Sequence, residues 1–525
     1  MTSLRLSTPA WLVTALALLV AVLFVRLAEA EPVISDPIGY VYAAGRLAQG
    51  EGLTYEDAND TIAGPYFVLY AFQVMRRGDA AHYLGFPPGF ALLLAPGAAV
   101  GLAQAVTPLL AALTLVAAYF LGNYLTDDPW VGLGAAVLLA GSAAFWQFGT
   151  AAWSEIPATL AVTAGIALYL RSRRGDHRLF FSLGAALVLS FGHFVRYTNV
   201  LFLAAPALYE LYTARRGLWV ERWRWPFWLA AAAGLAAIPL FNHFYYGGAL
   251  LTSYSPNHGW YPLPPFALAY ALGPSFVDGY SLRESLKTLW ANFPITLLLA
   301  PFGWWLLPRG SRLLVAAAVA FGVLPYAVYA FAPAGINSRF LLPVFPFLGV
   351  AIAQLIVVAL RRLNRPLRVA AGLALAIGVF LPVPGHVAAL QERNAASRAT
   401  VETARALTSG LEQDAVVLSY AYNDLVAVYG HRSVLNFRRI PLPDAGLGRY
   451  RMEMLEPCLV GAVDRLLARS IPVYYVDEQS PASWDAPAIL QRHFTLAEPA
   501  GDPPLVRILS RASAAPLDES ACRFP

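Results

Sequence analysis

Charged residues are scarce in this sequence. Lys, Arg, Asp and Glu make up 13% of its 525 residues, about half the fraction in a typical soluble domain. Hydrophobic residues make up 58%, and the mean hydropathy is +0.54. This composition excludes an ordinary soluble domain and predicts a polytopic α-helical membrane protein.

Cysteine is scarce too, and several catalytic motifs are missing. Cys458 and Cys522 both fall in the last polar part of the chain, where one disulfide can form if that part is extracytoplasmic. Their spacing does not pair them. No HExxH, GxSxG, P-loop or cysteine-rich motif is present, and Gly446-Leu-Gly448 lacks the third glycine of a dinucleotide site. Zinc hydrolase, serine hydrolase and nucleotide-binding functions therefore have no support.

Arginine gathers in short clusters between apolar runs. The net charge of +5 would suggest a nucleic-acid partner in a soluble protein, but this spacing is the positive-inside pattern, so no nucleic acid is expected. The four clusters, all expected in the cytoplasm, are Arg171, Arg173, Arg174 and Arg178; Arg215, Arg216, Arg222 and Arg224; Arg309 and Arg312; and Arg361, Arg362, Arg365 and Arg368.

Long apolar runs predict about 11 to 13 membrane helices. The first run, residues 10–28, follows Arg5 and predicts a helix with its N-terminus in the cytoplasm, although Ala28-Glu29-Ala30 also fits a signal cleavage site. Three runs between residues 86 and 149 join two outer loops, so one of them must be re-entrant or incomplete. The run at 180–212 is too long for one crossing and predicts a bent hairpin, with its tip near His193 and Arg196 on the outer side.

The chain divides into a membrane domain and a soluble domain. Residues 1–386 form the membrane part, with residues 31–85 as its first extracytoplasmic loop, and residues 387–525 form an extracytoplasmic α/β domain. The expected strands are 415–419, 433–437, 472–476 and 505–509, with a helix at 458–469. The same sidedness places residues 153–155, 247–291 and 332–339 on the extracytoplasmic side as well.

Asp36 stands just after the first membrane helix. Its carboxylate can stay ionised near water and still face a lipid-embedded substrate, as a base at a membrane surface requires. A turn or cap role before Pro37 explains it equally well. Apolar spacing predicts a short amphipathic helix at residues 38–49, which would hold Asp36 at its N-terminal end and favour the carboxylate form.

Two arginines stand apart from the clusters. Arg196 lies alone between apolar halves, and a buried arginine needs an anion, which is either Glu155 or the phosphate of a lipid-linked substrate. Arg339 repeats this logic at the outer mouth of a helix, with snorkelling to headgroups as the alternative. Glu155 fits a helix's first turn, but a charge this near the bilayer is also a functional candidate.

The order of these motifs resembles the GT-C class of membrane glycosyltransferases, which includes protein O-mannosyltransferases and lipid A aminoarabinose transferases. The resemblance covers about residues 10–385. It rests on Asp36-x-x-x-Tyr40 with Ala44, Leu47, Gly50 and Gly52; His82-Tyr83 with Pro87-Pro88-Gly89; Ser154-Glu155-x-Pro157; Arg196-Tyr197-Thr198; Asn242-x-x-Tyr245-x-Gly247 with Tyr254; and Ser338-Arg339-Phe-Leu-Leu-Pro343.

This resemblance implies an inverting transfer of a sugar from a polyprenyl phosphate to an acceptor hydroxyl at the outer face of the cell (inner) membrane. Asp36 would be the general base, and Arg196 and Arg339 would hold the donor phosphate. The acceptor would be a glycan, a lipid or a protein. The residues expected to contact acceptor or sugar are Tyr40, His82, Tyr83, Glu155, His193, Asn242, Tyr245 and Tyr254.

The sequence departs from the class at two motifs. Many relatives carry Asp-Glu where this chain has Asp36-Pro37, so a second carboxylate is absent or comes from Glu155 or Glu56. A divalent metal is therefore possible, with no metal ligand assigned. The Trp-Trp-Asp motif of oligosaccharyltransferases is missing, since Trp304-Trp305 lacks the Asp and Trp484-Asp485 lies in the soluble domain, so en bloc transfer to asparagine is not expected.

Two other functions fit parts of the pattern. A multi-pass transporter or lipid flippase would also show many helices and lone intramembrane charges, but the polar motifs gather at the outer face and no half-to-half repeat is visible. A non-catalytic scaffold built around the α/β domain would leave the large outer loop carrying Asp36 unexplained.

Overall fold

The structure is a computed structural model. It describes residues 7–69, 71–74, 81–214, 224–254, 266–274, 280–294, 296–419, 422–436, 440–441, 450–451, 456–477, 486–501, 503–512 and 522. Arg215, Arg216, Arg222, Gly446-Leu-Gly448 and Trp484-Asp485 lie outside these residues. The chain forms two compact units: unit 1 holds residues 1–30, 100–238 and 263–394, and unit 2 holds residues 31–99, 239–262 and 395–525.

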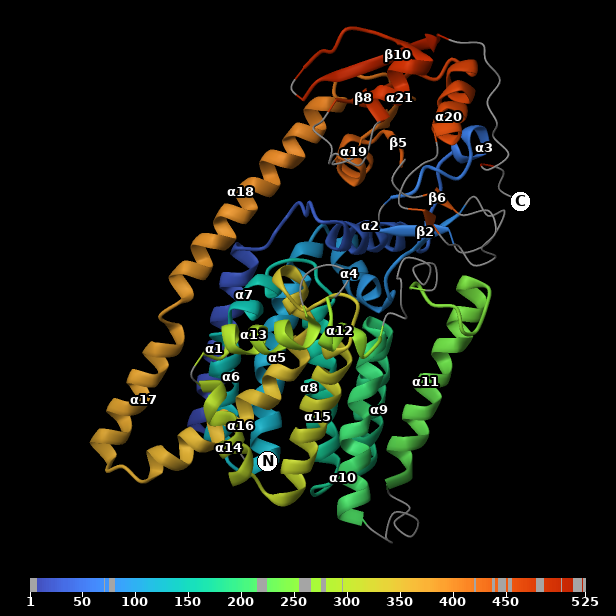
Figure 1. The fold of residues 1–525 in the computed structure, drawn as a ribbon. Helices are drawn as coiled ribbons and strands as arrows, with labels where there is room; N and C mark the ends of the chain where they lie inside the picture. The colour runs from blue at the N-terminus through green and yellow to red at the C-terminus, as the bar shows by residue number, and fades with distance from the viewer. Residues whose placement is uncertain are drawn as a thin grey trace. The chain divides into compact units, whose positions relative to one another are not determined.

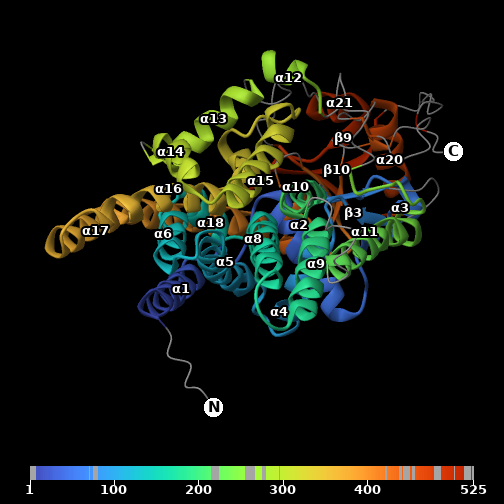
Figure 2. The same cartoon turned by 90° about the horizontal axis from the view of Figure 1, so that it is seen from below.

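Unit 1 is a bundle of apolar helices (Figures 1 and 2). Its interior is lined by residues such as Phe24, Phe145, Tyr169 and Phe345, all of them fully buried. Its elements are α1 (Thr8–Arg26), α5 (Ala103–Thr126), α6 (Pro129–Ala140), α7 (Ala143–Gly149), α8 (Glu155–Ser172), α9 (Arg178–Val195), η1 (Tyr197–Leu203), α10 (Ala204–Ala214), the first part of α11 (Trp225–Tyr246), α12 (Ala269–Leu272), α13 (Ser281–Asn292), η5 (Thr296–Leu299), α14 (Ala300–Leu306), α15 (Arg309–Ala327), η6 (Gly335–Val344), α16 (Phe345–Arg361), α17 (Arg365–Phe380) and the start of α18 (Val383–Thr408).

The predicted multi-pass membrane protein is confirmed. Among the described residues, 7 helices are long and apolar enough to cross a membrane, or up to 9 if each of two bent pairs is one span. The sequence predicts about 11 to 13 membrane helices, with one of the runs between residues 86 and 149 re-entrant or incomplete. Helix α4 (Gly89–Ala99) has only 11 residues, about 16 Å, and is too short for the bilayer core. This length fits the expectation that one run between 86 and 149 is incomplete.

The predicted break in the 180–212 run is also confirmed. Helix α9 ends at Val195, Arg196 is extended (φ −155°, ψ 114°), and the 3-10 helix η1 and helix α10 follow. The break exposes backbone groups of the last turn of α9, and the amide of Arg196 bonds to the carbonyl of Gly192. It places the Arg196 side chain at a helix end.

The first part of unit 2 holds the predicted amphipathic helix. Helix α2 (Ser35–Gln49) ends at Gly50, whose φ of +80° suits glycine. Tyr40 packs on Phe86 and Phe90, with ring centroids 5.3 and 4.9 Å away. Gly39 allows close approach, because a Cβ there would lie 2.3 Å from Cβ of Ala71. The strands β1 (Thr54–Tyr55), β2 (Phe72–Val74) and β3 (His82–Leu84) form an antiparallel sheet in the order β1-β3-β2, and α3 (Asp60–Ala63) lies between β1 and β2 in the chain.

The predicted α/β fold of the C-terminal part is confirmed. All four expected strands and the expected helix are present, as β4 (Val416–Leu418), β5 (Ser433–Leu435), β8 (Val473–Val476), β10 (Leu505–Arg511) and α20 (Glu456–Ala468). With β9 (Phe494–Leu496) they form a sheet in the order β5-β4-β8-β10-β9, in which β4 is parallel to β5 and β8, and β10 is antiparallel to β8 and β9. The remaining elements are α19 (Asn423–Gly430), β6 (Ile440–Pro441), β7 (Tyr450–Arg451) and α21 (Ala486–His493).

Cys458 and Cys522 form a disulfide. Both residues are buried in the core between α20 and the sheet. The structure therefore supplies the pairing that the cysteine spacing leaves open.

Candidate functional site

The predicted site residues fall into two groups, one in each unit. Unit 1 holds Glu155, His193, Arg196 and Arg339, and unit 2 holds Asp36, Tyr40, His82, Tyr83, Asn242, Tyr245 and Tyr254.

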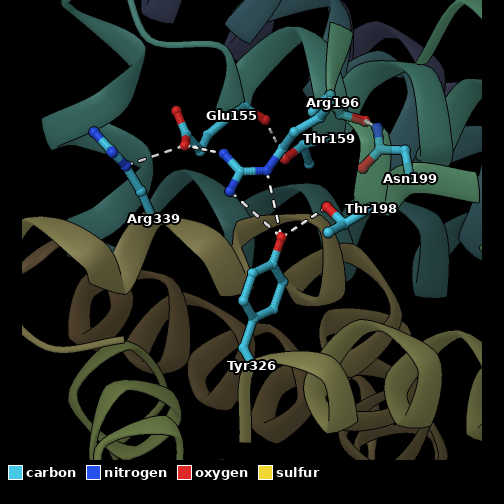
Figure 3. A network of polar contacts seen from close by, with 8 residues as sticks. Glu155, Thr159, Arg196, Thr198, Asn199, Tyr326 and Arg339 are labelled. Atoms are coloured by element: carbon cyan, nitrogen blue, oxygen red, sulfur yellow. Dashed lines mark hydrogen bonds and ion pairs between the residues drawn. The ribbon is translucent and has the colours of Figure 1, made fainter. Parts of the chain in front are cut away.

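Glu155 is the centre of the group in unit 1 (Figure 3). It lies in the first turn of α8 and only 1% of its surface is exposed. Arg196 Nη1 donates to its Oε1, and Arg339 Nε lies 3.2 Å from the same oxygen. The pairing with a protein carboxylate, one of two partners expected for Arg196, is therefore present.

Aromatic rings support both guanidinium groups. Arg339 lies over Trp153, with its Cζ 4.1 Å from the ring centroid, and Arg196 lies over Phe340 at 4.7 Å. Arg339 is 9% exposed. Because cation–π contact stabilises a desolvated guanidinium, these rings help to keep the two cations near each other. This burial argues against snorkelling of the Arg339 guanidinium to the lipid headgroups.

Tyr326 completes the network from α15. Its hydroxyl accepts from Nε and Nη2 of Arg196 at 3.4 Å and shares a 2.7 Å hydrogen bond with Thr198. Tyr326 and Thr198 are neutral, so Glu155, Arg196 and Arg339 give the network a net charge of +1. The second carboxylate oxygen of Glu155 is buried and has no hydrogen-bond partner among the described residues. Because its net charge is positive, the network is a basic cluster at a helix break, suited chemically to an additional anion.

His193 lies close to this network in the chain. It occupies the last turn of α9, with its ring 5.6 Å from the Tyr197 ring, and is half-buried.

Asp36 lies where the sequence predicts it. It is half-buried in the first turn of α2, after the extended residue Ile34. The positive end of the helix dipole favours an ionised carboxylate here. Tyr40 follows one turn later and is 3% exposed, so it is mainly a packing residue in this structure.

His82 has a carboxylate partner that sequence reasoning missed. His82 is completely buried on β3, and its Nε2 lies 2.6 Å from Oδ2 of Asp60. Asp60 Oδ1 accepts from the Phe67 amide at 3.1 Å. Burial raises the pKa of the Asp60 carboxyl above its ordinary value of 3.8, while His82 and the Phe67 amide act in the opposite direction. Contact of His82 with an acceptor stays a prediction.

Four further candidates remain in unit 2. The Tyr83 and Tyr245 rings meet edge to face with centroids 5.1 Å apart. Asn242 is 3% exposed, and its side-chain oxygen is buried without a hydrogen-bond partner in the described ranges. Tyr254 is 39% exposed. The structure therefore brings Tyr83 and Tyr245 together and leaves Tyr254 at the surface.

A metal site is not formed by the described residues. Among them, no group of three or more His, Cys, Asp or Glu side chains lies close enough to hold a metal ion.

Sequence comparisons identify no relative. No protein-family model matches the chain. No curated protein sequence matches it either.

Solved structures that are similar to this chain include membrane glycosyltransferases of the GT-C class. The predicted resemblance to that class is confirmed at the level of the fold. One such structure is ArnT from Cupriavidus metallidurans bound to undecaprenyl phosphate, with a TM-score of 0.59 and 13% identity over 97% of this chain and 99% of that one. The apo form of the same ArnT has a TM-score of 0.58 and 14% identity, covering 95% of this chain and 97% of that chain.

An archaeal oligosaccharyltransferase is similar too. AglB from Archaeoglobus fulgidus, in complex with an inhibitory peptide and a dolichol-phosphate, has a TM-score of 0.51 and 10% identity, covering 97% of this chain and 75% of that chain.

Proposed function

We propose that this chain is a glycosyltransferase that moves a sugar from a polyprenyl-phosphate donor to an acceptor hydroxyl at the outer face of the cell membrane. The observation that carries the proposal is the buried basic network of Glu155, Arg196 and Arg339, within a fold shared with ArnT and AglB. Those structures hold undecaprenyl phosphate and dolichol-phosphate respectively.

Asp36 is the proposed general base. The acceptor oxygen attacks the anomeric carbon, its proton passes to the Asp36 carboxylate, and the bond from the anomeric carbon to the phosphate oxygen breaks. The lipid phosphate leaves with that electron pair. Since the phosphate is already an adequate leaving group, the protein has to position the reactants and stabilise charge. A single displacement inverts the anomeric centre.

Arg196 and Arg339 are the proposed phosphate ligands. Two guanidinium groups held by one carboxylate and two aromatic faces are pre-oriented, so little side-chain entropy is lost when an anion binds. Glu155 keeps the two cations together before the donor arrives. Tyr83, Asn242, Tyr245, Tyr254 and His193 are the proposed contacts for sugar and acceptor.

A transfer assay tests this function. The full chain in liposomes is given a panel of radiolabelled polyprenyl-phosphate sugars, beside Asp36→Asn and the surface control Glu51→Gln. Transfer by the intact protein and Glu51→Gln, and its loss in Asp36→Asn, is the expected result. No binding or turnover of any donor would favour the transporter or flippase function, and lipid translocation would then be measured.

A further inference from the structure

Part of the loop that follows α2 lies inside the core of the α/β domain. Ala63, Tyr66 and Phe67 are buried in one cluster with residues of the sheet and of α20, among them Leu435 and Leu459. Burying Tyr66 and Phe67 fully removes two large rings from water, which amounts to several kilocalories per mole of stabilisation. Loop and domain therefore fold as one body within unit 2.

Hydrogen bonds to backbone carbonyls fix the same loop. The Asn436 amide donates to the Tyr66 carbonyl at 2.9 Å, and its side-chain amide donates to the Val68 carbonyl at 2.8 Å. Arg465 donates to the Ala63 carbonyl at 2.9 Å. Asn436 follows β5 and Arg465 lies on α20, so two elements of the α/β domain hold residues 63–68.

The Asp60–His82 pair joins this loop to the small sheet. Asp60 starts α3, beside the segment held by the α/β domain, and His82 is on the central strand β3. The pair is buried, 2.6 Å long, and also engages the Phe67 amide through Asp60. A buried pair of this kind is costly to break, because the remaining group is left without a partner in a dry environment.

Strand β3 leads directly to the packing partners of α2. Four residues after His82, Phe86 contacts Tyr40 of α2, and Phe90 contacts the same ring. On its other side α2 contacts the α/β domain, where Ile38 is buried with Val401 and Leu425. The helix that begins with Asp36 is thus held both by β3 and by the α/β domain.

From these contacts we propose that Asp60 and His82 are positioning residues that couple the α/β domain to helix α2 and so orient Asp36. The α/β domain then acts as an internal brace of the first loop. The orienting role rests on the proposed function of Asp36, whereas the mechanical coupling does not.

The test compares a disruptive and a conservative change at one position. His82→Phe keeps a ring but removes the partner of Asp60, and His82→Gln keeps a nitrogen donor near the position of Nε2. Asp60→Ala and the double variant Asp60→Ala/His82→Phe complete a cycle, and Glu51→Gln is the surface control. Each full-length variant is measured for turnover with a polyprenyl-phosphate sugar and for hydrogen exchange.

The expected result is a kcat lowered at least tenfold in His82→Phe and Asp60→Ala, with donor and acceptor KM within threefold of the parent. His82→Gln should recover most of the turnover, and the double variant should lose no more than either single one. Exchange should rise at least tenfold in α2 (Ser35–Gln49) as well as in residues 60–68.

Hydrogen exchange keeps the test independent of activity. If exchange rises only in residues 54–84 while α2 and kcat stay unchanged, the pair stabilises its own sheet and the coupling proposal is overturned. If exchange spreads to α2 in a chain that transfers no sugar, coupling stands and the proposed function fails. If His82→Phe does not fold, His82→Gln and Asp60→Ala supply the comparison.

Discussion

The carboxylate of Glu155, at the start of α8, pairs with the guanidinium of Arg196, at the break after α9. The two residues are 41 positions apart in the chain, and Arg339 shares the same carboxylate oxygen. Both the break and the first turn of α8 are needed for this contact. The pair therefore links the local structure of two membrane helices to the chemistry proposed for the donor phosphate.

Glu155→Gln should destabilise the empty protein and sensitise it to donor. Removing the carboxylate leaves the buried Arg339 and the partly buried Arg196 without their anion, which costs on the order of 3 kcal/mol. A polyprenyl phosphate can supply the missing negative charge, so it should raise the melting temperature of this variant more than that of the parent. Thermal unfolding in nanodiscs with and without polyprenyl phosphate measures both effects.

Glu284→Gln is the matched control for Glu155→Gln. Glu284 also has two cations beside it, Arg283 and Lys287, but their side chains are 57% and 59% exposed. Glu284→Gln should neither destabilise the protein nor increase its response to polyprenyl phosphate, since water screens such pairs. An equal response to polyprenyl phosphate in both variants would contradict an anion site at Glu155.

Tyr326→Phe should weaken donor binding without affecting the proposed general base, Asp36. The change removes a hydroxyl that contacts Arg196 and Thr198, and one such hydrogen bond contributes about 1 kcal/mol. The donor KM should rise about threefold to tenfold, with kcat nearly unchanged. Tyr119→Phe, at a buried tyrosine elsewhere in unit 1, is the control and should leave both constants at the parental value.

The Asp60 carboxyl should give unit 2 a pH-dependent stability. Because burial raises the pKa of Asp60 above 3.8, the native state binds this proton more tightly than the unfolded state does. The stability from this group is full below about pH 4 and is lost as pH rises through the raised pKa. Asp60→Asn cannot titrate, so the stability of the parent relative to the variant should fall over that range.

Hydrogen exchange of residues 60–68 between pH 4 and 7, corrected for intrinsic rates, measures the difference in stability between the parent and Asp60→Asn. A parent that gains stability over Asp60→Asn as the pH rises would show that the pKa of Asp60 is lowered instead.

Reduction of the disulfide should loosen the α/β domain. Cys458 and Cys522 are 64 residues apart, and a cross-link over such a loop contributes about 4 kcal/mol in the chain-entropy account. Reduction should raise exchange in α20 by up to about 1,000-fold where it occurs through unfolding of the domain. The variant Cys458→Ser/Cys522→Ser should already exchange fast and should not respond to reductant, and a response there would point to another cause.

Local patterns predicted much of this fold. Residues 38–49, the strands of the α/β domain and the break at Arg196 follow from periodicity, from strand composition and from the length of an apolar run. Apolar length alone does not reveal that α4 has only 11 residues or that α6 and α7 are bent by 69°.

Long-range partners were harder to predict. The sequence left Arg196 with two possible anions and left the cysteines unpaired, since nothing local encodes contacts 41 and 64 residues apart. Asp60 was missed altogether. It stands 22 residues from His82 in a polar loop, where an aspartate usually has only a turn or cap role, and only the folded loop buries it.

The most direct test of the central claim separates donor binding from turnover in two variants. A single-turnover experiment follows release of polyprenyl phosphate from a bound radiolabelled donor in the parent, Asp36→Asn and Arg339→Ala. The account predicts that Asp36→Asn binds the donor within threefold of the parent but turns it over at least 1,000-fold more slowly, as expected for loss of a base. Arg339→Ala should bind it at least tenfold more weakly. Parental turnover in Asp36→Asn would contradict the account.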